Sequence, residues 1–172
     1  MTEPVHDTMR AADSGAYRHG DSGTSFPPRY DGPRMLSQAL TRLARSDDIF
    51  TRDGPRADVE YRDLGWAAAS GGAIGAKHVR AIRPFEAETG WHWHDMAGHF
   101  IYVLKGWIRF RYAGIDEPVT VGAGASLSQP AGVAHNVIAR SDDLELIEIN
   151  LPAGYGTWAL AVEPGTDAGS RA

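Results

Sequence analysis

Four of the seven histidines in this chain fall between positions 92 and 135, at spacings that suit metal binding. In the segment His92-Trp93-His94, an extended strand would put both imidazoles on one face and the tryptophan on the other. Residues two apart on a strand are roughly 6.5–7 Å apart at the backbone, so two rings can reach one ion at about 2.0–2.1 Å from each nitrogen. Since the chain has no cysteine, any metal must be bound by nitrogen or oxygen ligands.

Two further histidines open alternating runs. His99 begins a run in which Ile101 shares the face of the imidazole, and His135 begins another with Val137 and Ala139 on its own face. If these runs are strands of one sheet structure, their inward faces bring His99 and His135 toward the first pair.

Short segments of β character must position these histidines. Glycine, proline and aspartate turn signals separate eight of them. The predicted strands are Val59–Leu64, Ile74–Arg83, Phe100–Leu104, Trp107–Tyr112, Pro118–Val121, Ala125–Ser128, His135–Ala139 and Leu144–Asn150. This spacing predicts an antiparallel sandwich or barrel. Before them, apolar residues at helical spacing predict a short helix from Met35 to Leu43 that packs outside the barrel.

The histidines sit in two glycine-framed motifs. The first consists of Gly90, His92, His94, His99 and Gly106, and the second of Gly124, Pro130, Gly132 and His135. Both motifs resemble those of small single-domain cupins. The resemblance implies an all-β fold, the double-stranded β-helix or jelly-roll barrel, with a short N-terminal helix. It also implies one divalent metal on His92, His94, His99 and His135, and a homodimer.

Two positions depart from the usual cupin pattern. Cupins usually carry a glutamate ligand where this chain has His99, and an asparagine where it has Ala139. Small cupins with four histidines do exist, and some bacterial aromatic polyketide cyclases are similar in this respect. The resemblance therefore implies a histidine-only variant of the metal site.

Four neutral imidazoles leave a divalent ion its full charge, which favours capture of an anionic oxygen ligand in a low-dielectric barrel. Imidazole ligation suits a transition metal, here Zn, Fe, Ni, Mn or Cu, better than Mg or Ca. The predicted function is Lewis-acid activation of an enolisable, oxygenated small organic substrate for cyclisation, isomerisation or elimination. One alternative is a non-haem Fe(II) cupin dioxygenase. The other is a cupin that binds a small molecule without catalysis.

Other residues near the motifs have two interpretations each. Glu148 lies in an apolar run, where an acid can be a catalytic base, although at a barrel edge it would simply be exposed. Trp91 and Trp93 are expected to face away from the metal and to pack on the helix or on a partner subunit. Arg109 and Arg111 are expected to face outward. The residues expected to line the substrate pocket are Ile101, Val103, Ile108, Phe110, Tyr112 and Val137.

Composition and charge bound the remaining possibilities. Residues 1–33 are polar and aperiodic and are predicted to be a disordered extension, followed by a cupin domain over 34–163 and a flexible tail over 164–172. The net charge of −5 and the lack of a basic stripe argue against a nucleic-acid partner. No apolar segment has the length of a signal or a membrane span, so we expect a cytoplasmic protein without a membrane partner.

Overall fold

The computed structural model describes Arg34, Ser37 and residues 50–165, and the fold below is that of this part. Its strands are β1 (Val59–Asp63), β2 (Gly75–Ala81), β3 (His92–His94), β4 (Gly98–Lys105), β5 (Trp107–Tyr112), β6 (Ile115–Gly122), β7 (Ser126–Gln129), β8 (His135–Arg140), β9 (Glu145–Leu151) and β10 (Thr157–Ala159). One helical turn, α3 (Trp66–Ala69), connects β1 to β2. The extension over 1–33 and most of the predicted helix lie outside the described residues, so neither is tested.

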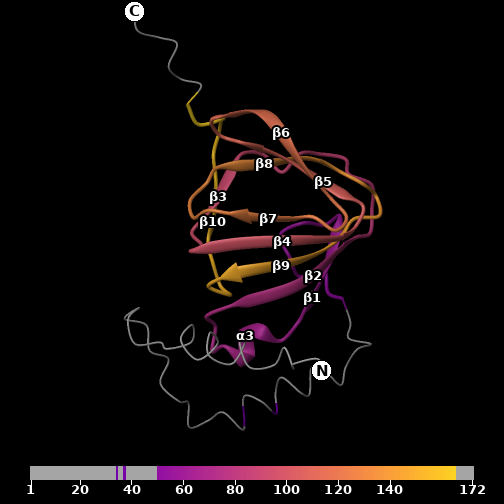
Figure 1. Cartoon of the computed structure of the whole chain (residues 1–172), viewed down its shortest axis with the longest axis vertical. Coiled ribbons are helices and arrows are strands. Elements are labelled where there is room, and N and C mark those ends of the chain that lie inside the picture. Colours follow the sequence, from indigo (N-terminus) through magenta and orange to yellow (C-terminus); the bar gives the residue numbers. More distant parts are fainter. Residues whose placement is uncertain (1–33, 35–36, 38–49, 166–172) are drawn as a thin grey trace, which may run out of the picture. The chain divides into compact units, whose positions relative to one another are not determined.

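The strands form two five-stranded antiparallel sheets. Sheet A has the order β1-β2-β9-β4-β7, and sheet B has the order β10-β3-β8-β5-β6. Neighbours within each sheet come from distant parts of the chain, as β4 and β9 show at the centre of sheet A (Figure 1). This arrangement confirms the predicted all-β jelly-roll class.

Alternation along the strands sorts side chains between the barrel interior and its outside. On β5, Ile108, Phe110 and Tyr112 are at most 6% exposed, whereas Arg109 and Arg111 are exposed. The core combines such residues from both sheets. The prediction for this strand is therefore confirmed in its boundaries and in its faces.

Strict alternation does not hold along β8. The prediction that Ala139 shares the face of His135 and Val137 is wrong. Phe110 pairs with Val137 but Arg109 pairs with Ala139, so Ile138 is an extra residue in β8. Such a bulge reverses the inward and outward faces beyond it. Ala139 is consequently only half-buried, and Arg140 takes the interior position with 5% exposure.

Two elements are not predicted by the sequence, and several strands begin or end at other residues than predicted. Neither α3 nor β10 was predicted, because four and three residues are too short to show a period. Predicted strand ends differ from the observed ones by up to three residues, the largest difference being at the start of β6. In the part of the chain that the structure describes, no helix is long and apolar enough to cross a membrane.

Candidate metal centre

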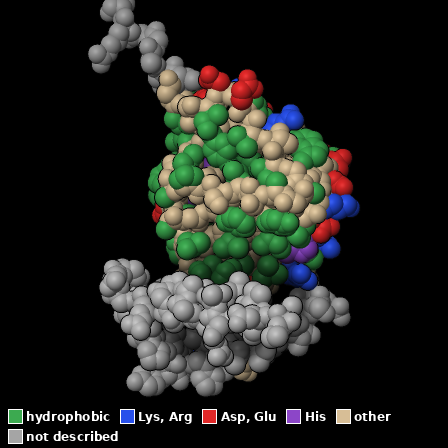
Figure 2. All heavy atoms as spheres, in the orientation of Figure 1, with side chains coloured by type: hydrophobic (Ala, Val, Ile, Leu, Met, Phe, Trp, Pro, Cys, Tyr) green, Lys and Arg blue, Asp and Glu red, His purple; other side chains and the backbone are tan. Residues whose placement is uncertain are grey.

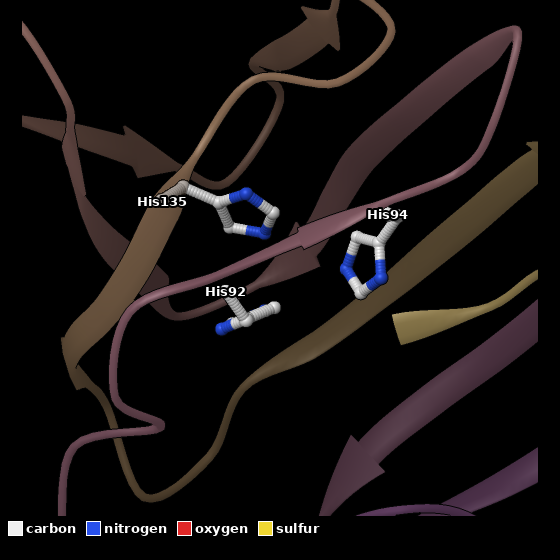
Figure 3. A group of neighbouring side chains, drawn as sticks. All are labelled: His92, His94 and His135. Atoms are coloured by element: carbon white, nitrogen blue, oxygen red, sulfur yellow. The ribbon is translucent and has the colours of Figure 1, made fainter. Parts of the chain in front are cut away.

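Three of the predicted ligands converge from two neighbouring strands of sheet B. His92 and His94 project from β3, and His92 pairs directly with His135 at the start of β8. The ring centroid of His92 is 4.3 Å from that of His135 and 5.0 Å from that of His94 (Figure 3). Each of the three side chains offers a nitrogen within 4.8 Å of the other two. This group could hold a metal ion.

Hydrogen bonds to backbone carbonyls fix which ring nitrogen is free in His92 and His135. The Nδ1 atom of His92 lies 2.8 Å from the Gly90 carbonyl oxygen, and that of His135 lies 2.9 Å from the Val133 carbonyl oxygen. A carbonyl only accepts, so Nδ1 carries the proton in both rings, and the lone pair is on Nε2. The Nδ1 atom of His94 lies 2.9 Å from the hydroxyl oxygen of Thr157. Anchoring of the second ring nitrogen is the arrangement that orients histidine ligands around metals.

Two buried polar side chains, those of Gln129 and Tyr112, lie next to His135. The amide nitrogen of Gln129 lies 3.0 Å from His135 Nδ1, which is a packing contact because Nδ1 already donates its proton to the Val133 carbonyl. The Tyr112 hydroxyl donates a hydrogen bond of 3.1 Å to the amide oxygen of Gln129. Gln129 and Tyr112 are themselves buried. The ring of His135 is therefore held on one side by backbone and on the other by a packed side chain.

The protonation states also suit ligation. Burial is the main cause that lowers the pKa of His94 to about 4 and that of His135 to about 3, and the charge of His92 adds to the shift in both. Both imidazoles are accordingly neutral at pH 7. A neutral imidazole has the lone pair that a metal needs, so the donor set fits a divalent transition metal.

His99, the fourth predicted ligand, lies outside this group of three. It projects from β4 in sheet A, and its ring centroid is 5.8 Å from that of His94. Both of its ring nitrogens are buried without a hydrogen-bond partner, although Nε2 lies 3.3 Å from a carboxylate oxygen of Glu148. The contact is thus close but poorly aligned. Ligation by His99 stays a prediction.

Glu148 faces the interior instead of lying exposed at the barrel edge. Its side chain is 16% exposed and reaches the same cavity as the histidines. Burial by itself raises the pKa of a carboxyl, but the neighbouring His99, Lys77 and His94 outweigh it and lower the pKa of Glu148 overall. Glu148 is therefore an ionised carboxylate inside the barrel.

The four histidines and Glu148 line one cavity of about 580 Å³ inside the barrel. Four of the six predicted pocket residues line it, namely Ile101, Ile108, Phe110 and Val137. Val103 and Tyr112 belong to the buried core and do not line the cavity. A volume of this size is typical of small-molecule sites.

The two tryptophans beside the histidines differ from the expectation and from each other. Trp93 faces away from the metal group and stacks on Trp158 of β10, with ring centroids 6.0 Å apart. Trp91 lies before the first residue of β3 and lines the cavity, so its predicted outward orientation is wrong. The strand alternation does not extend to it.

Several residues of the cavity were not singled out from the sequence. Thr157 and Tyr155 come from the region of β10, which gave no periodic signal. Alternation could have indicated Lys77, because it lies two residues before the buried Val79 on β2 and therefore shares its inward face. Arg140 could not be found by alternation because of the bulge in β8.

Comparison with known proteins agrees with this geometry. The family model described as "Cupin domain" matches residues 79–150, which include all four histidines and Glu148. Residues 79–150 are a cupin domain. A comparison with curated proteins found no match.

Solved structures with cupin folds resemble the chain at low sequence identity. The polyketide cyclase RemF from Streptomyces resistomycificus is 19% identical with a TM-score of 0.51, over 66% of this chain and 80% of that one. KdgF from Halomonas sp. is 18% identical with a TM-score of 0.49, over 63% and 91%. A Bacillus subtilis oxalate decarboxylase is 22% identical with a TM-score of 0.46, over 59% of this chain and only 27% of its own length. At these identities the likeness to RemF shows the fold alone.

Proposed function

We propose that this cupin is a metal-dependent enzyme that activates an enolisable, oxygenated small organic substrate. The observation that carries the proposal is the group formed by His92, His94 and His135, whose Nδ1 atoms are all anchored and whose rings face a cavity. A site with ligands oriented in advance and room for a substrate is typical of a catalytic metal centre.

The chemistry that a bound divalent ion supplies is polarisation of a carbonyl and stabilisation of the enolate formed from it. The three histidines would hold the ion, and His99 is the proposed fourth ligand. The rest of the chain shapes the cavity. Ile101, Ile108 and Val137 supply aliphatic walls that exclude water, which strengthens every electrostatic interaction in the cavity.

A cupin dioxygenase is the second candidate, and the position of His99 favours it. If only the three grouped histidines held a metal, the protein would supply one ligand fewer, which would leave more room for a substrate together with dioxygen. A non-catalytic binding cupin is the third candidate, and it would bind ligand without turning it over.

Metal content and oxygen dependence separate these candidates. We would purify the chain without a histidine tag, measure bound metals by mass spectrometry and load it with Zn or Fe(II). Hydroxyacetone in D₂O would then report enolisation as loss of its methylene proton signal, and oxygen uptake with acetylacetone would report dioxygenase activity. The proposal expects zinc-dependent proton exchange under anaerobic conditions. The proposed enolisation is contradicted if the Zn-loaded protein shows no proton exchange and the Fe(II)-loaded protein takes up oxygen.

Two His99 variants test the fourth ligand. Because glutamine retains hydrogen-bonding capacity but not the imidazole, His99→Gln lowers metal affinity if His99 is a ligand. His99→Glu keeps a ligand but adds a negative charge, which weakens the hold on an anionic enolate mimic. Unchanged metal content in the first variant and unchanged mimic affinity in the second would leave a three-histidine ion and would move the dioxygenase ahead.

We also propose that the protein is a homodimer. The outer face of sheet A is apolar, with Tyr102 and Leu104 of β4 at least 40% exposed and Leu151 of β9 close to that (Figure 2). An exposed apolar patch of this kind is typical of an interface. Light scattering at micromolar concentration tests this, and a monomeric mass contradicts it. A cytoplasmic location stays a prediction.

A further inference from the structure

A second polar cluster faces the three histidines from the other sheet. Glu148 of β9 pairs in register with Lys77 of β2 on one side and with Ile101 of β4 on the other, and all three line the cavity. His99 also projects from β4. The three-histidine group belongs to sheet B, so the substrate cavity has this group on one wall and the acid–lysine pair, together with His99, on the opposite wall.

Glu148 lies beside the metal group without being part of it. Its carboxylate oxygen Oε1 is 3.3 Å from His99 Nε2, and it accepts a hydrogen bond of 3.5 Å from the Tyr155 hydroxyl. The Tyr155 ring is in turn 5.3 Å from that of His94. The three-histidine group does not include Glu148. One side chain, either His99 or Tyr155, therefore lies between the carboxylate and the group of three histidines.

Lys77 holds a positive charge next to this carboxylate. Its Nζ atom lies 5.8 Å from the centre of the Tyr61 ring and 6.0 Å from that of the Tyr155 ring. Both distances are within the range in which an ammonium group is attracted to an aromatic face. The lysine is thus positioned by two rings, and it stabilises the charge of Glu148 across the strand pair.

The other carboxylates of the cavity are bound to other side chains or exposed. Asp58 forms ion pairs with Arg56 and Arg140, and Glu88 accepts a hydrogen bond from Asn136. Glu86 is exposed. Among the acids that line the cavity, Glu148 is the one next to the candidate metal ligands.

We propose that Glu148 is the group that accepts and returns the substrate proton, and that Lys77 is a positioning residue for it. This inference rests on the proposed function and adds the residue that moves the proton. In the forward step the C–H bond next to the carbonyl group of the substrate breaks, and an O–H bond forms on the carboxylate of Glu148. The electron pair of the broken bond becomes the carbon–carbon double bond, and the carbonyl oxygen becomes the enolate oxygen. For a hydroxy ketone, return of the proton to the former carbonyl carbon, with transfer of the substrate's own hydroxyl proton to the enolate oxygen, gives an isomerised product, and no other reactant is needed.

Bromoacetone tests the carboxylate without any turnover. This small haloketone resembles an enolisable ketone, and attack by a carboxylate oxygen on its methylene carbon forms an ester and releases bromide. We expect peptide mapping to find the ester on Glu148, in the metal-free and in the Zn-loaded protein. Glu148→Gln should lose this label, whereas the control Glu117→Gln, at an exposed carboxylate of β6 outside the cavity, should keep it. Labelling of histidines alone, with Glu148 unmodified, overturns the inference.

The role of Lys77 has a readout of its own. Lys77→Met should slow esterification of Glu148, and Lys77→Arg, which retains the charge, should restore the rate. If Lys77 only supported the fold, arginine would not restore an esterification rate that methionine, which has a similar shape, had lowered. Equal labelling rates in all three proteins contradict the positioning role.

Proton exchange then separates this inference from the proposed function. In Zn-loaded protein, Glu148→Gln should slow exchange of the hydroxyacetone methylene protons by roughly 10²-fold or more, at unchanged zinc content, while Glu117→Gln exchanges at the wild-type rate. Wild-type exchange that survives in Glu148→Gln contradicts only the role of Glu148. No exchange by the wild type contradicts the proposed reaction class itself.

Discussion

Replacement of Thr157 by valine tests whether the hydrogen bond to His94 prepares that ring for metal binding. Valine has nearly the shape of threonine but lacks the hydroxyl that lies 2.9 Å from His94 Nδ1. A hydrogen bond between neutral groups contributes about 0.5–1.5 kcal/mol and one to a charged group about 1.5–3 kcal/mol. When Nε2 binds a cation the ring becomes partly positive, so the bond strengthens on metal binding by about 1–1.5 kcal/mol.

That difference converts to a loss of metal affinity. With 1.36 kcal/mol for each tenfold change, it corresponds to about five- to twelvefold. Thr157 is exposed, and the backbone of Gly156 also contributes a hydrogen bond to His94, so water or this carbonyl can partly replace the hydroxyl. We therefore expect a loss near the lower end, about fivefold.

A competition titration with a chromophoric zinc chelator measures this change. The matched control is Thr120→Val, because the Thr120 hydroxyl accepts a hydrogen bond from Arg109 on the exposed face of β5 and β6. The control should bind zinc like the wild type. If Thr157→Val binds zinc as tightly as the control, anchoring of Nδ1 does not prepare His94, and the argument from the anchored rings fails.

Three further predictions follow from the site and the core. His92→Ala should remove most of the stoichiometric metal and lower the melting temperature of the metal-loaded protein, because binding energy stabilises the fold; unchanged metal content by mass spectrometry would contradict the site. Arg140→Met should lower the free energy of unfolding by about 1–3 kcal/mol in urea denaturation, because the partly buried carbonyl oxygens that accept from the guanidinium lose their donor, although Asp58 keeps its ion pair with Arg56. The exposed Arg111→Met should have little effect. In the metal-free protein the lowered pKa values of His94 and His135 mean that the unfolded chain binds protons first as pH falls. Stability should therefore be full above about pH 6.5 and decrease toward about pH 4, and a flat urea midpoint over this range would refute the burial of these rings.

The sequence by itself predicted an antiparallel β-sheet class and a shared face for His92 and His94, and the resemblance of its two motifs to those of cupins added the jelly-roll form and His135. The first two predictions depend on local periods: alternation assigned Ile108 and Phe110 to the interior, and two histidines two apart must share a face of any strand. The spacing of glycines around His135 marked the turn that leads into β8. These features need no knowledge of which strands become neighbours.

The tertiary structure decided what depends on pairing between distant strands. The bulge in β8 arises from its register with β5, and it places Arg140 in the interior where the sequence pattern puts Ala139. The partner of His94 comes from β10, sixty-three residues away along the chain. Glu148 and Lys77 become neighbours only because β9 pairs with β2. A one-residue change in any of these registers would turn the side chain to the opposite face, and the local sequence carries no measure of register between remote strands.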